Sequence, residues 1–172
     1  MTRTAAMIWA VAATLGLVMA SAVILVWSGL YNIAADDHHT AVVLEALEKL
    51  RERSISARAQ DIEVPDLQDP LKVVAGADRY ATLCLGCHLA PGVTTSDIRP
   101  GLYPHPPNLA QGKILDAQRA FWVTKHGIKM SAMPAWGKTL SDAQIWEIIA
   151  FVRKMPDMSP ATFRQILQSP AK

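Results

Sequence analysis

The chain has 172 residues, of which 51% are hydrophobic and 19% charged, and its formal net charge is +2. This length allows one modest domain plus an appendage. The basic residues are dispersed along the sequence, which argues against a nucleic-acid-binding protein.

The first element is an uncharged stretch of 26 residues, 5–30. As a helix it would extend about 39 Å, against about 30 Å for the hydrocarbon core of a bilayer. A cleaved signal peptide is the alternative, because Ala20-Ser21-Ala22 has the small-x-small form of a cleavage site. Strongly apolar sequence continues through residues 23–27, however, so we expect an uncleaved membrane anchor over residues 1–35.

Flanking charges predict how this anchor is oriented. Arg3 precedes the apolar stretch, whereas Asp36 and Asp37 follow it, so the short N-terminus should stay inside and the rest of the chain should face out. Trp27 and Tyr31, near the outer end, are candidate interfacial anchors.

Residues 36–69 are expected to form an amphipathic helix and a linker. The linker is indicated by Pro65 and Pro70. His38 and His39 do not predict a metal site, because adjacent histidines point to different faces of a helix and no further ligands are near. The apolar residues that recur at helical spacing, and are expected to pack, are Val42, Val43, Ala46, Leu47 and Leu50.

The segment Cys84-Leu85-Gly86-Cys87-His88 holds the only two cysteines of the chain. C-x-x-C-H is the attachment sequence of c-type haem: each thiol can form a thioether with a haem vinyl group, and the histidine is placed under the iron as an axial ligand. A disulfide or thioredoxin-like pair would not need the histidine, and zinc would need four ligands, which the sequence does not supply at finger spacing. We therefore expect one covalently bound haem c.

This motif and the orientation of the anchor support each other, since c-type haem is attached on the outer side of the bacterial inner membrane. They predict a single-pass protein of that membrane with its haem domain, residues 70–172, in the periplasm. Residues 73–83, 116–126 and 141–154 are expected to be helical, the last beginning with a capping box of Ser141 and Gln144, and no strands are expected. Five prolines make residues 90–109 a loop that can wrap the haem edge: Pro91, Pro100, Pro104, Pro106 and Pro107.

Two methionines compete for the second axial position. Met133 lies among prolines, small residues and turn formers that would let its thioether approach the iron from a loop, and Met130 lies three residues earlier. By chemistry alone either sulfur could serve, and either could instead fill a gap in the core. A filled position favours electron transfer, whereas an open one favours catalysis or gas binding.

The order of C-x-x-C-H, Pro107-Asn108-Leu109, Met133-Pro134-Ala135-Trp136 and a C-terminal helix resembles the class I monohaem cytochromes c, especially the membrane-anchored bacterial type, over residues 71–156. The resemblance implies an all-α domain in which Met133 is the distal ligand. It also implies that the carbonyl of Pro107 accepts a hydrogen bond from His88, with Pro91 as the weaker candidate.

The same resemblance implies a helix crossing. A glycine and an aromatic residue one turn apart on the first helix of these cytochromes pack across an aromatic residue of the last helix. Gly76, Tyr80 and Phe151 match this pattern.

Charge is uneven along the chain. Residues 70–172 carry 12 basic and 6 acidic residues, a net +6, whereas residues 36–69 carry 4 basic and 9 acidic residues, a net −5. Lys113, Lys125, Lys129 and Lys138 bracket the Met133 loop and could steer the protein to an acidic docking site on a redox partner, or could form an ordinary solvated surface.

We therefore expect an electron carrier and not an enzyme, acting alone or as the haem subunit of a larger membrane redox complex. The alternative is a haem-based gas or redox sensor, or a small catalytic haem protein, in which the methionine is displaced. Trp122 and His126 would then be the side chains of interest.

Overall fold

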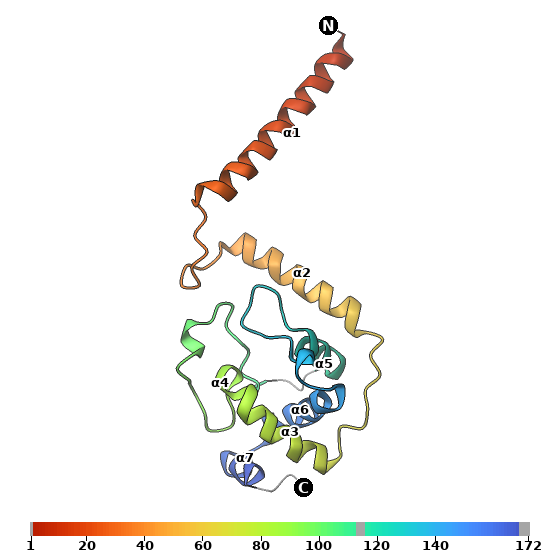
Figure 1. Cartoon of the computed structure of the whole chain (residues 1–172), viewed down its shortest axis with the longest axis vertical. Coiled ribbons are helices and arrows are strands. Elements are labelled where there is room, and N and C mark those ends of the chain that lie inside the picture. Colours follow the sequence, from red (N-terminus) through yellow and green to blue (C-terminus); the bar gives the residue numbers. More distant parts are fainter. Residues whose placement is uncertain (1, 113–115, 169–172) are drawn as a thin grey trace. The chain divides into compact units, whose positions relative to one another are not determined.

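The computed structural model describes residues 2–112 and 116–168 and forms two compact units, Met1–Asp37 and His38–Lys172. Within the described residues the regular structure is helical, with one isolated β-bridge between Ala90 and Val93 and no strand (Figure 1). The all-α prediction is confirmed for this part of the chain.

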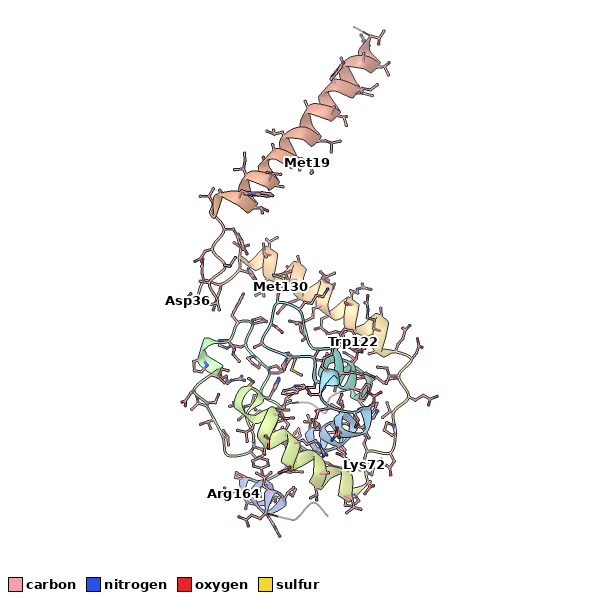
Figure 2. The ribbon with its side chains drawn as sticks, in the orientation of Figure 1. Met19, Asp36, Lys72, Trp122, Met130 and Arg164 are labelled. Carbon is pink, nitrogen blue, oxygen red and sulfur yellow. The ribbon has the colours of Figure 1, made fainter. Side chains whose placement is uncertain are left out.

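The first unit is built on α1 (Arg3–Ser28), a helix of 26 residues. The Thr2 hydroxyl accepts a hydrogen bond from the backbone N–H of Ala5 (3.4 Å), and Gly29 ends the helix in the left-handed conformation at φ 67°. None of its residues is buried, and Figure 2 shows side chains such as that of Met19 standing away from the helix. An 18-residue stretch of α1 has a mean hydropathy of 2.3, so α1 is a candidate membrane span.

The second unit contains the remaining helices. The regions expected to be helical at 73–83, 116–126 and 141–154 appear as α3 (Pro70–Leu83), α5 (Ala117–His126) and α6 (Asp142–Lys154). The structure adds α4 (Leu85–His88) and α7 (Pro160–Leu167), which the sequence patterns did not predict. The others are α2 (Ala41–Ala59) and three 3₁₀ helices, η1 (Arg99–Gly101), η2 (Trp136–Lys138) and η3 (Met155–Asp157).

The core forms where α3 crosses α6. A Cβ atom on Gly76 would lie 1.9 Å from the backbone oxygen of Glu147, so only glycine permits this approach. One turn later, the rings of Tyr80 and Phe151 pack with centroids 5.3 Å apart, and both residues are fully buried. The crossing implied by the resemblance is confirmed. Phe163 of α7, also buried, joins the same core cluster.

Helix α6 begins with the expected capping box. The Ser141 hydroxyl accepts from the backbone N–H of Gln144 (3.3 Å), and the Gln144 side-chain oxygen accepts from the backbone N–H of Ser141 (2.9 Å). The residues predicted to face the core from this helix are all buried: Ile145, Ile148, Ile149 and Val152.

Helix α2 lies in the second unit and packs on α5, but the side predicted to pack is wrong. Its buried residues are Ile55 and Ala59, and Arg51, one turn earlier on the same side, is partly buried. The hydrogen bonds from α5 reach Glu52, Ser56 and the segment just after α2, whereas five apolar residues in the first half of α2 are exposed. These are the expected packing residues Val42, Val43, Ala46, Leu47 and Leu50.

Candidate functional site

A cavity of about 460 Å³ lies inside the second unit. Its wall is mainly apolar and is formed by residues of α2 to α6 and by the loops at residues 104–109 and 128–136. Its volume lies within the range of about 300–1,000 Å³ that is common for cofactor sites. The five predicted site residues, which are Cys84, Cys87, His88, Pro107 and Met133, all line it.

The two cysteines reach the cavity from the junction of α3 and α4. The backbone N–H of Cys84 donates to Tyr80 (2.9 Å), and that of His88 donates to Cys84 (2.9 Å), so the three motif residues lie on one continuous helical turn. Burial, followed by the nearby Cys87, raises the pKa of the Cys84 thiol to about 12. A redox-active cysteine pair instead contains a cysteine with a lowered pKa. This environment therefore suits a cysteine that is bonded to haem through a thioether and not a redox-active pair.

His88 is oriented by a single hydrogen bond. Its Nδ1 lies 3.0 Å from the carbonyl oxygen of Pro107, and because a carbonyl can only accept, Nδ1 carries the hydrogen and Nε2 keeps its lone pair. Burial lowers the pKa of His88, an effect that the bond to Pro107 opposes and the charge of Arg99 assists. The imidazole is therefore neutral at neutral pH, which is the form that binds a metal ion.

The loop after α5 carries Met133 to the cavity. Gly127 begins this loop at φ 67°, and a Cβ atom there would lie 2.7 Å from the backbone oxygen of Met133. The backbone N–H of Ile128 donates to that same oxygen (3.1 Å), which closes the loop on itself. Met130, at its outer end, is 91% exposed and does not line the cavity (Figure 2).

These residues fit a covalently attached haem. Two thiols and a neutral imidazole come from one turn, a thioether comes from a separate loop, and apolar side chains line most of the cavity between them. These are the donors that hold and ligate a c-type haem.

The lining residues that the sequence did not anticipate include a group from α2 and from the start of α5. Arg51, Glu52 and Ile55 belong to α2, and Asp116 and Arg119 belong to the start of α5. Only the spacing of Arg51, Ile55 and Ala59, every four residues, marks one side of α2, and that pattern is too short to stand out among the surrounding charges.

Several other residues singled out in the sequence lie outside the cavity. The rings of Trp122 and His126 lie 4.9 Å apart, and neither lines it. His38 and His39 contact the ring of Tyr103, with centroids 4.4 and 5.6 Å away. Among the described residues, no group of three or more His, Cys, Asp or Glu side chains could hold a metal ion.

The lysines predicted to bracket the Met133 loop are not equivalent. The ammonium group of Lys125 lies 2.7 Å from the carboxylate of Asp142, which offsets its charge. Lys113 lies outside the described residues. Lys129 and Lys138 are both exposed.

Residues 72–152 match the family model described as cytochrome C oxidase, cbb3-type, subunit III. This segment runs from the first turn of α3 almost to the end of α6 and contains every predicted site residue. No curated protein and no solved structure matches the chain. The matched domain, the helical fold and the cavity lead to one conclusion: the chain carries a monohaem class I cytochrome c domain that binds haem c covalently and serves haem-based electron transfer.

Proposed function

We propose that His88 and Met133 are the two axial ligands of the haem iron, so that the protein is an electron carrier with no open coordination position. The observation that carries this proposal is the position of both side chains on the wall of one cavity, with His88 held in the correct tautomer by Pro107. The alternative ligand, Met130, is almost fully exposed.

Each residue then has a defined task. The haem, when bound, supplies an iron that changes by one electron between its ferric and ferrous states. Cys84 and Cys87 tether the macrocycle, and Pro107 orients the imidazole of His88 and raises its basicity through the Nδ1 hydrogen bond. The soft sulfur of Met133 stabilises the ferrous form and so raises the reduction potential.

The proposed location is the bacterial inner membrane, with α1 as an uncleaved anchor and the haem domain in the periplasm. The length and hydropathy of α1 support the anchor, and the positions of Arg3, Asp36 and Asp37 support the orientation. The matched family is described as an oxidase subunit, which supports a role as haem subunit of a membrane redox complex beside that of free carrier. Purification from detergent extracts with bound partners distinguishes the two.

The proposed partner is a redox protein with an acidic docking face. Lys129 and Lys138 lie on either side of Met133 in the sequence, and both are exposed. Lys125 contributes less than its charge suggests, because Asp142 pairs with it.

The axial ligation is tested by two methionine variants. Met133→Ala should remove the sulfur-to-iron absorption band near the red end of the oxidised spectrum and lower the reduction potential, because the thioether ligand is lost. Met130→Ala is the matched control and should leave both unchanged, since its side chain is in solvent. The opposite pattern would assign the ligand to Met130.

A further inference from the structure

One wall of the haem cavity comes from outside the region that matches the cytochrome family. Residues 72–152 match, whereas α2 ends at Ala59. Yet Arg51, Glu52 and Ile55 of α2 line the cavity, and Ile55 is only 5% exposed. Helix α2 is therefore part of the haem site and not merely a connection to the anchor.

Helix α2 is fixed to α5 by polar contacts as well as by Ile55. The side-chain amide of Gln118 donates to the carbonyl oxygens of Gln60 (3.0 Å) and Ile62 (2.7 Å). The guanidinium group of Arg119 donates to the hydroxyl of Ser56 and to the carboxylate of Glu52. These contacts hold the C-terminal half of α2 against the start of α5.

This side of the cavity carries charges that an apolar cofactor surface would not need. Four charged side chains line it here, Arg51 and Glu52 from α2 and Asp116 and Arg119 from α5. The carboxylate of Asp116 caps α5 by accepting from the backbone N–H of Arg119 (2.9 Å). Glu52 contacts both guanidinium groups and lies 3.1 Å from Nε of Arg51. Two arginines are thus held side by side at the cavity wall.

The chemistry of haem indicates what these arginines meet. Its vinyl groups lie along one edge of the macrocycle and its two carboxylates lie along the opposite edge. Thioethers to Cys84 and Cys87 fix the vinyl edge at the junction of α3 and α4, so the carboxylates point away from that junction. An ionised carboxylate in a largely apolar cavity is costly unless a cation pairs with it, and the planar guanidinium group matches it with two parallel hydrogen bonds.

We propose that Arg51 and Arg119 bind the haem carboxylates, and that α2 is an additional wall which closes the carboxylate edge of the haem. This inference rests on the covalent attachment of haem and on the axial ligation proposed above. Glu52 positions both guanidinium groups, and Arg119 also holds α2 in place through Ser56. The arginines offset the negative charge of the carboxylates near the iron and so disfavour the ferric form, which carries the additional positive charge.

Three variants of the full-length holoprotein test this proposal. Arg51→Gln and Arg119→Gln each remove one guanidinium group at the cavity, and Arg53→Gln makes the same change at an exposed position of α2 that does not line it. At a fixed applied potential, the ratio of oxidised to reduced haem should rise about threefold to tenfold in the first two variants, where tenfold equals 59 mV for one electron. The resonance Raman band of haem carboxylate bending should shift in the same two, and Arg53→Gln should change neither.

The outcomes separate this proposal from the proposed function. If Arg51→Gln and Arg119→Gln keep the sulfur-to-iron band and also behave like Arg53→Gln in potential and Raman spectrum, the carboxylate assignment is wrong and the axial ligation stands. If the native protein lacks the sulfur-to-iron band, the proposed ligation of the iron by Met133 is wrong, whatever the arginine variants show. Should Arg119→Gln not fold, because α2 loses its contacts, Arg51→Gln decides the question alone.

Discussion

Gly76 is the residue that allows α3 to approach the backbone of α6 closely. An added Cβ would lie 1.9 Å from the oxygen and 2.5 Å from the carbonyl carbon of Glu147, and backbone atoms cannot move aside as a flexible side chain can. Gly76→Ala should therefore lower the free energy of unfolding by about 1–3 kcal/mol or more, as overpacking a core does. Urea unfolding followed by haem absorbance measures this loss.

Gly101 provides the control for this prediction. A Cβ atom there would have nothing within 4 Å, so Gly101→Ala should change the free energy of unfolding by less than about 0.5 kcal/mol. Equal stability of the two variants would show that α3 and α6 do not approach as closely as described.

Site residues that belong to a short sequence motif could be predicted from the sequence. Site residues whose position depends on how distant segments pack could not. The proposed haem-binding residues Cys84, Cys87 and His88 follow from their spacing alone. Choosing Met133 over Met130 required either the resemblance or the fold, since both sulfurs have the same chemistry. Arg51 escaped prediction because its position on the cavity wall depends on how α2 packs on α5.

The apolar helix α1 predicts how firmly the protein is attached to the membrane. A helix of 26 residues that contains an 18-residue stretch with a mean hydropathy of 2.3 should partition into the bilayer and stay there without help from charge. The protein should therefore remain with the membrane fraction after high-salt and alkaline washing, and its mature mass should include residues 1–35. Immunoblotting and intact mass spectrometry check both points.

An N-terminus that begins after Ala22 or Ala35 in the isolated protein would contradict the anchor and indicate a processed carrier. Release by alkaline washing of a chain that still contains residues 1–35 would instead show that α1 does not span the membrane.

Elements with local start signals were predicted well. Helix α6 has a capping box and a regular apolar stripe, and both were found in the structure as expected. The packing side of α2 was predicted wrongly. Most of its larger apolar residues lie in its first half, where they are exposed, whereas its buried residues, Ile55 and Ala59, lie near its C-terminal end. Helix α7 was missed, although Ser159 caps it, because a helix of 8 residues shows too little periodicity.

At the scale of the whole molecule, surface charge should affect the rate of electron exchange. If Lys129 and Lys138 steer an acidic partner, the rate should fall as salt rises, because the screening length shortens to about 8 Å at physiological ionic strength. Replacing both with Gln should flatten this dependence. Stopped-flow measurements with an acidic redox protein over a range of salt concentrations provide the test.

Lys72 is the matched control for that experiment. It lies on α3, well away from Met130 of the Met133 loop in Figure 2, and its ammonium group donates to the backbone oxygen of Asp66 (2.8 Å). Lys72→Gln should leave the salt dependence as it is in the native protein. A salt-independent native rate would remove the steering proposal and leave the axial ligation untouched.

Carbon monoxide binding to the reduced protein tests the proposed axial ligation by His88 and Met133, because the gas needs an open or easily vacated position on the iron. With His88 and Met133 filling both axial sites, the reduced spectrum should hardly change on addition of carbon monoxide, whereas Met133→Ala, the positive control, should bind it readily. Rapid and tight binding by the native protein would contradict this ligation: Met133 would then be absent from the iron or easily displaced, and a sensor or catalytic role would replace electron transfer.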